Sequence, residues 1–203
     1  MSVARSAPAA ATARLVTVFG RLFESEFVTL ERFAISCRAP DGMRYLDETV
    51  ALARLLGDGD PEAPFEPADP SVHALHRAMY AAWPDFQAVV TGPSRHLRSL
   101  LAEGCAMPEP TSMMRKRGVT RLDDHIVADG ALAGPRLAAT LAEARETATA
   151  NGMKHVLLIE PDGTVHAAGP TPEETMAHYS NVEFSARVEC ARIEEALGQR
   201  LDG

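Results

Sequence analysis

A buried strand between two helices limits the folds that this chain can adopt. Residues 86–91 include three consecutive apolar side chains without a polar break, and Gly92 and Pro93 end the run. Such a run is typical of a strand with little exposure to water. Residues 69–83 repeat apolar side chains at helical spacing behind an Asp-Pro start, and a second helix is predicted from Ser94. The order helix, strand, helix indicates an α/β protein.

Two hairpins and three further helices are predicted from apolar spacing and turn residues. They cover residues 12–27 (helix), 33–46 (hairpin), 135–151 (helix), 154–169 (hairpin) and 171–197 (helix). Residues 57–70 are rich in proline and acidic residues, which predicts an exposed irregular loop. Residues 107–130 show no clear period and leave room for one or two short strands.

The composition favours one globular domain. The chain has 203 residues, of which 46% are hydrophobic, and its formal net charge of −8 argues against a nucleic-acid binder. No run reaches the roughly 18 apolar residues that span a bilayer, so no membrane partner is expected. Cys37, Cys105 and Cys190 lack disulfide or metal spacing, which indicates free thiols in the cytoplasm. We expect a disordered tail over residues 1–11 and a single domain over residues 12–203.

Two stretches resemble the class II aldolase/adducin family. Residues 75–90, LHRAMYAAWPDFQAVV, are similar to that family's helix, Pro-Asp turn and Ala-Val-Val strand. Residues 155–176, HVLLIEPDGTVHAAGPTPEETM, are similar to its later hairpin and helix start, and residues 32–43 give a weaker match. The resemblance implies a three-layer α/β/α sandwich with a central, mainly antiparallel sheet. It also implies a homo-oligomer, a tetramer, with the cleft between subunits.

The residues that bind zinc in this family have no counterparts here. In the family, the Ala-Val-Val strand leads into two zinc-binding histidines and a third precedes the glycine of the later hairpin; these positions hold Thr91, Pro93 and Asp162. Val72 stands at the position of the family's acidic residue, and residues 31–33 lack its phosphate-holding Gly-Asn. Proline has no ligand atom, threonine is a poor zinc ligand, and one carboxylate holds the ion weakly. We therefore expect no zinc cofactor and no zinc-dependent aldolase activity.

His96 is the candidate catalytic residue, because it follows the strand that carries the zinc pair in the family and an imidazole titrates near neutral pH. Arg95 and the amides of the helix start at Ser94 form a candidate site for a small anion. The other residues assigned to this cleft are Thr91, Gly92, His73, Asp162 and His166. Glu183 interrupts the apolar stripe of the last helix, so we expect it to pair with an arginine or with backbone amides.

Two functions remain open from the sequence. The first is a non-catalytic, or at least non-zinc, binding or assembly module, for which the adducin heads are a precedent within the family. The second is a lyase, decarboxylase or isomerase that acts on a small oxygenated acid or a sugar phosphate, with His96 as acid and base. Metal content and ligand binding separate the two.

Overall fold

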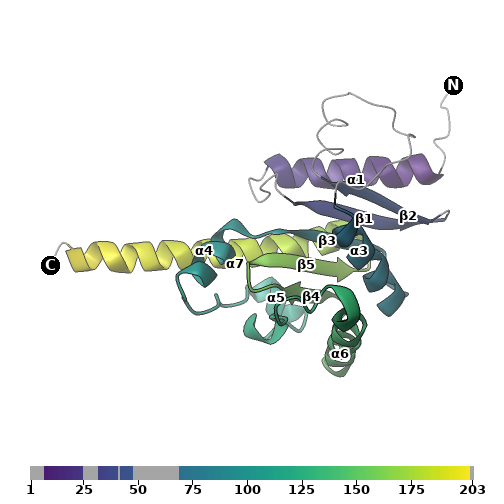
Figure 1. Ribbon diagram of the computed structural model, residues 1–203. Coiled ribbons are helices and arrows are strands. Elements are labelled where there is room, and N and C mark those ends of the chain that lie inside the picture. The colour runs from purple at the N-terminus through teal and green to yellow at the C-terminus, as the bar shows by residue number, and fades with distance from the viewer. Residues whose placement is uncertain (1–6, 25–31, 41, 48–68, 202–203) are drawn as a thin grey trace.

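The centre of the protein is a five-stranded antiparallel sheet. The computed structural model describes residues 7–24, 32–40, 42–47 and 69–201. The strands lie in the order β2-β1-β3-β5-β4, and each neighbouring pair is antiparallel. They are β1 (Ala34–Ala39), β2 (Gly42–Asp47), β3 (Ala88–Pro93), β4 (Val156–Ile159) and β5 (Thr164–Gly169). The predicted buried strand, β3, is the middle one (Figure 1).

Helices cover both faces of this sheet. They are α1 (Ala7–Glu24), α3 (Pro70–Ala82), α4 (Arg95–Ala102), α5 (Ser112–Lys116), α6 (Leu137–Ala150) and α7 (Pro172–Leu201). One core cluster joins the sheet to α1, α4, α5 and α7, and the other joins it to α3 and α6. The architecture is therefore the predicted three-layer α/β/α sandwich with an antiparallel sheet.

Successive strand residues divide the core between the two faces. On β3, Val90 packs in the cluster of α1, α4 and α7, and Val89 packs in the cluster of α3 and α6. Leu157 and Leu158 of β4 divide in the same way. Because neighbouring strand residues point to opposite faces, an apolar run without polar breaks is what a strand covered on both sides requires.

Two helices begin at the caps that the sequence predicts. Asp69 Oδ1 accepts the Ser71 N–H at 2.9 Å at the start of α3. Thr171 Oγ1 accepts the Glu174 N–H at 3.2 Å at the start of α7, as the Thr-x-x-Glu spacing of a capping box favours. These bonds satisfy amides that the first turn of a helix leaves without an internal partner.

The N-terminal helix begins earlier than predicted. α1 starts at Ala7, so residues 7–11 are helical and do not belong to a disordered tail, while residues 1–6 lie outside the described residues. Four of these five residues are alanine, which has the highest helix propensity. The alanine content therefore favours helix here, although it lacks the apolar spacing from which the start was predicted.

The segment without a clear period contains only short elements. Residues 107–130 hold α5 and a 3-10 turn at Asp123–His125. Ile126 forms an isolated parallel bridge with Ile159 of β4 in place of a predicted short strand. Most of the predicted loop at residues 57–70 lies outside the described residues.

The last helix extends beyond the sheet (Figure 1). α7 has 30 residues, and its buried positions end at Ala186, whereas Val188 and Leu197 are about half exposed at 52% and 54%. Neither this helix nor any other in the described part of the chain is long and apolar enough to cross a membrane.

Candidate functional site

The positions that bind zinc in the resembling family lie at one end of the sheet. Thr91 and Pro93 of β3 pair with His166 and Thr164 of β5, and Asp162 lies in the turn that precedes β5. The sheet register thus places Thr91 beside His166. These are two of the predicted cleft residues, and the fold brings them together.

Thr91 is the centre of a buried hydrogen-bond chain. Its Oγ1 lies 2.9 Å from His76 Nε2 and 2.8 Å from His166 Nδ1. The three residues are 1%, 0% and 2% exposed in the order Thr91, His76, His166, so water does not compete for these bonds. The hydroxyl of Thr91 therefore links an imidazole of α3 to an imidazole of β5.

The chain continues in both directions from these histidines. His76 Nδ1 lies 2.8 Å from Ser36 Oγ, and Ser36 Oγ lies 3.0 Å from the Tyr80 hydroxyl. At the other end, His166 Nε2 lies 2.9 Å from Glu160 Oε1. The Glu160 side chain is 30% exposed, whereas Ser36 and Tyr80 are buried. The chain runs from the surface into the interior.

The carboxylate at the surface end fixes the direction of these bonds. A carboxylate only accepts, so His166 donates to Glu160 from Nε2, and in a neutral ring its Nδ1 then accepts the hydroxyl hydrogen of Thr91. Thr91 then accepts the Nε2 hydrogen of His76, and His76 Nδ1 accepts from Ser36. Burial lowers the pKa of His76 well below its ordinary value, which keeps the ring neutral as this order requires.

The other two positions that bind zinc in the resembling family, Pro93 and Asp162, also form hydrogen bonds within the fold. The carbonyl of Pro93 accepts the Tyr179 hydroxyl at 2.9 Å. Asp162 Oδ1 accepts the Thr164 N–H at 2.9 Å, and Asp162 Oδ2 lies 3.8 Å from a guanidinium nitrogen of Arg98. Asp162 therefore stabilises its own turn and pairs with a cation at the surface.

These residues do not fit a zinc ion of the family's type. A catalytic zinc site needs three protein ligands and an open position. Thr91 has its hydroxyl hydrogen and a lone pair engaged, and Pro93 has no side-chain donor. Among the described residues, no three His, Cys, Asp or Glu side chains gather in an arrangement that could hold a metal ion.

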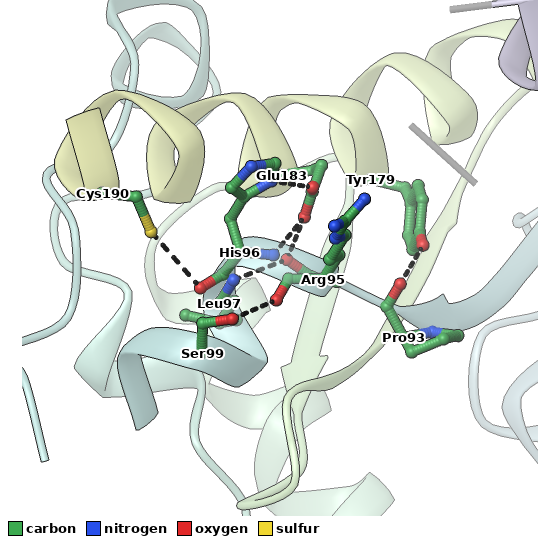
Figure 2. Close-up of polar contacts among 9 residues, drawn as sticks. Pro93, Arg95, His96, Leu97, Ser99, Tyr179, Glu183 and Cys190 are labelled. Carbon is green, nitrogen blue, oxygen red and sulfur yellow. Dashed lines mark hydrogen bonds and ion pairs between the residues drawn. The ribbon is translucent and has the colours of Figure 1, made fainter. Parts of the chain in front are cut away.

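A second polar cluster joins α4 to α7. Figure 2 shows Glu183 of α7 facing the first turn of α4, where its Oε2 accepts the Ser94 hydroxyl at 2.5 Å and the His96 N–H at 3.4 Å. Glu183 Oε1 lies 2.5 Å from His96 Nδ1. The expected backbone partner of Glu183 is therefore present, and two side chains stand in place of the expected arginine.

Glu183 occupies the helix start where the sequence predicts a bound anion. The N-terminus of a helix favours negative charge, and here the chain's own carboxylate already accepts the His96 N–H. Ser94 is 1% exposed, while Arg95 is exposed. The predicted anion binding consequently rests on Arg95.

Packing closes the floor of the predicted cleft. A Cβ at Gly92 would lie 2.7 Å from Phe33 Cδ2 and 2.9 Å from the Tyr179 hydroxyl, so this strand position is covered. His73 lies outside the buried chain, and its ring packs edge-on against Tyr45 with 5.1 Å between centroids. The accessible members of the predicted set are Arg95 and Asp162, which are exposed, and His73 and His96, which are partly exposed.

Comparison with known proteins gives structural matches alone. No protein-family model matches the sequence, and no curated protein matches it. YgbL from Escherichia coli superposes with a TM-score of 0.64 at 17% identity, over 90% of this chain and 89% of YgbL. L-fuculose-1-phosphate aldolase from Thermus thermophilus superposes with a TM-score of 0.59 at 17% identity, over 90% and 94%. L-fuculose 1-phosphate aldolase from Glaciozyma antarctica superposes with a TM-score of 0.58 at 13% identity, over 94% of this chain and 77% of the aldolase.

The chain has the class II aldolase fold. The matches cover nearly its whole length, so the predicted resemblance to the class II aldolase/adducin family is confirmed at the level of structure. Identities of 13% to 17% establish the fold and not the activity, because one fold hosts many functions.

Four members of the buried chain on this class II aldolase fold are absent from the site that the sequence predicts: Ser36, His76, Tyr80 and Glu160. One signal was present in the sequence. His76 and Tyr80 are four positions apart on the same buried face of α3 as Leu75 and Met79. Polar side chains on an apolar face need partners, so this spacing indicates a buried polar network without naming its other members.

Proposed function

We propose that this chain is a binding or assembly module with the class II aldolase fold that works without zinc. Thr91 carries the proposal. Its hydroxyl is bonded to His76 and His166 at a position where the family resemblance puts a zinc-binding histidine. The polar groups at the positions that bind zinc in the resembling family therefore stabilise the fold here, and binding is left to the surface.

Small anions are the ligand class that the accessible charges favour. Arg95 is exposed at the start of α4, and Arg98, one turn later, pairs loosely with Asp162 at 3.8 Å. A phosphate or carboxylate ligand can form charge-assisted hydrogen bonds with both arginines if it displaces Asp162 from Arg98. We further propose a cytoplasmic homo-oligomer, a tetramer by resemblance, as the assembled form.

Thermal unfolding with a panel of small acids and sugar phosphates tests the ligand. A ligand that binds only the native state stabilises it by about 2.7 kcal/mol at one hundred times its dissociation constant. We expect at least one compound to raise the melting temperature of the wild type and not that of Arg95→Ala. Arg145→Ala, an exposed arginine on α6 at the other face of the sheet, is the matched control. Equal shifts in wild type and Arg95→Ala contradict the ligand proposal.

Light scattering tests the assembly. We expect a mass several times that of the 21.8 kDa chain at micromolar concentration. A monomer that also shows no thermal shift with the panel contradicts the binding and assembly function as a whole.

A second candidate function is a lyase, decarboxylase or isomerase, without metal or with a weakly bound divalent ion, in which His96 is the acid and base. What supports it is the pairing of His96 Nδ1 with Glu183 Oε1 at 2.5 Å. Turnover of the same panel by the wild type, with loss in His96→Gln, is the expected result. Turnover retained in His96→Gln contradicts this second candidate.

A further inference from the structure

We infer that Glu183 is a positioning residue that holds His96 with its hydrogen on Nδ1 and leaves Nε2 as a pre-oriented proton acceptor at the surface. This inference rests on the second candidate function and deepens it, because it names the group that sets the state of the base. His96 and Glu183 lie 87 positions apart in the sequence and meet only where α4 contacts α7.

The partners of Glu183 decide which atom of His96 carries the hydrogen. Ser94 Oγ accepts the Leu97 N–H at 3.2 Å, so its own hydrogen is available for Glu183 Oε2 at 2.5 Å. The His96 N–H also points at Oε2. A glutamate carboxylate only accepts hydrogen bonds, and two donors already meet at its Oε2. Nδ1 of His96 must then donate to Oε1.

The Glu183 side chain is buried, and the His96 side chain is partly exposed. The Glu183 side chain is 4% exposed and that of His96 is 34% exposed. The carboxylate is therefore shielded from water, while the outer part of the ring reaches solvent. A neutral imidazole with Nδ1–H has its lone pair on Nε2, so the nitrogen that is not bonded to Glu183 is the one that can take a proton.

The backbone on either side of His96 is tied to α7. The Pro93 carbonyl accepts the Tyr179 hydroxyl at 2.9 Å, and the His96 carbonyl lies 3.8 Å from Cys190 Sγ (Figure 2). Together with Glu183, these contacts hold the segment that carries His96 at three successive points along α7, and Glu183 holds the ring itself. A base that is already oriented loses little freedom when a substrate arrives.

The chemistry that this arrangement fits is proton abstraction from a small anionic carbon acid. A C–H bond of the substrate breaks, its electron pair stays on the substrate as a carbanion or enolate, and the proton forms a new N–H bond at Nε2 of His96. The resulting imidazolium faces the Glu183 carboxylate, which stabilises its charge. Arg95, the preceding residue, is exposed and offers a positive charge to the substrate.

Replacing Glu183 by glutamine tests the inference through the tautomer of His96. An amide has one accepting oxygen and one donating NH2 group. If the oxygen keeps Ser94 and the His96 N–H, the NH2 group faces Nδ1, which must then accept, and the hydrogen of the ring moves to Nε2. Such a change preserves the arrangement of the side chains and gives the wrong tautomer.

Long-range proton–nitrogen NMR correlations at neutral pH report which ring nitrogen is protonated. We expect protonated Nδ1 in the wild type and protonated Nε2 in Glu183→Gln. Glu189→Gln, which changes a carboxylate on α7 that pairs with Arg192, should leave His96 unchanged. Protonated Nε2 in the wild type overturns the inference, and this measurement needs no variant to fold.

Acylation by diethyl pyrocarbonate, followed by peptide mass spectrometry, gives a second readout. In this reaction Nε2 attacks the carbonyl carbon, forms a carbethoxy-imidazole and releases ethanol and carbon dioxide. We expect His96 to react at least about tenfold more slowly in Glu183→Gln, because a protonated Nε2 has no free lone pair. His73, which has no bond to Glu183, is the internal control and should react at an unchanged rate. Equal rates at His96 in a folded Glu183→Gln protein overturn the inference.

Neither readout needs a substrate. A panel that yields no turnover, together with the expected tautomer and acylation rates, removes the second candidate function and leaves the role of Glu183 intact. Turnover together with a protonated Nε2 of His96 in the wild type supports the second candidate function and overturns the role of Glu183.

Discussion

Replacing Thr91 by valine removes one hydroxyl and keeps the branched shape of the side chain. Among the described residues, the hydroxyl is the group that joins the two histidines of the buried chain, since its Oγ1 lies 2.9 Å from His76 Nε2 and 2.8 Å from His166 Nδ1. A methyl group in its place fills the same space and bonds to neither. The variant therefore isolates the hydrogen bonds from the packing.

The expected loss follows from the two partners that the valine leaves behind. Both imidazoles are at most 2% exposed, so water cannot replace the hydroxyl. An unsatisfied buried polar group costs about 1–3 kcal/mol. Two such groups, the Nε2 hydrogen of His76 and the Nδ1 lone pair of His166, predict a loss of about 2–6 kcal/mol in the free energy of unfolding.

Urea unfolding at neutral pH measures this loss. Thr91→Ser keeps the hydroxyl and removes one methyl group, so it should lose only about 1 kcal/mol. The order wild type, Thr91→Ser, Thr91→Val is therefore expected, with the larger step at valine. A loss below about 1 kcal/mol for Thr91→Val refutes the reasoning, because it means that the buried chain contributes nothing beyond packing.

Two further changes test other parts of the fold. Burial lowers the pKa of His178 to about 3 from an ordinary 6.5, and no ring nitrogen of His178 or of the neighbouring His155 has a hydrogen-bond partner within the described residues. As the pH falls, the unfolded chain therefore binds a proton at His178 before the folded chain does. Above pH 6.5 His178 does not lower the free energy of unfolding. Below it, that free energy falls by up to about 1.4 kcal/mol per pH unit as the pH drops toward 3. Urea titrations between about pH 4 and 7 should show a smaller pH dependence of stability in His178→Leu than in the wild type. An unchanged pH dependence contradicts the assignment of this slope to His178. Gly163→Ala puts a Cβ 2.8 Å from Arg98 Cα at a φ of +81° and should lose about 2–4 kcal/mol. Gly130→Ala, with a φ of +66° and open space around it, should lose about 1 kcal/mol, so equal losses contradict the close approach at Gly163.

The order of helices and strands is predictable because each element marks its own stretch of sequence. The apolar run in β3 and the caps at Asp69 and Thr171 depend on residues a few positions apart. The start of α1 at Ala7 was missed because alanines favour a helix without marking a buried face. Short elements such as α5, with five residues, leave too few turns for a period to appear.

The polar contacts of the site depend on residues that are distant in sequence. Thr91 meets His166 across 75 positions, and Ser36 meets His76 across 40. Such pairs follow from sheet register and helix packing, which no local pattern specifies. His96 could be singled out because it follows β3, but its partner Glu183 lies on another helix. The sequence showed only that Glu183 needs a partner.

Metal content tests the central claim most directly. Protein purified without chelators and analysed by inductively coupled plasma mass spectrometry should contain far less than one zinc per chain, and its urea midpoint should not change after dialysis against EDTA. Stoichiometric zinc that disappears in Thr91→Ser or His96→Gln would contradict the claim that the positions that bind zinc in the resembling family serve the fold in this chain.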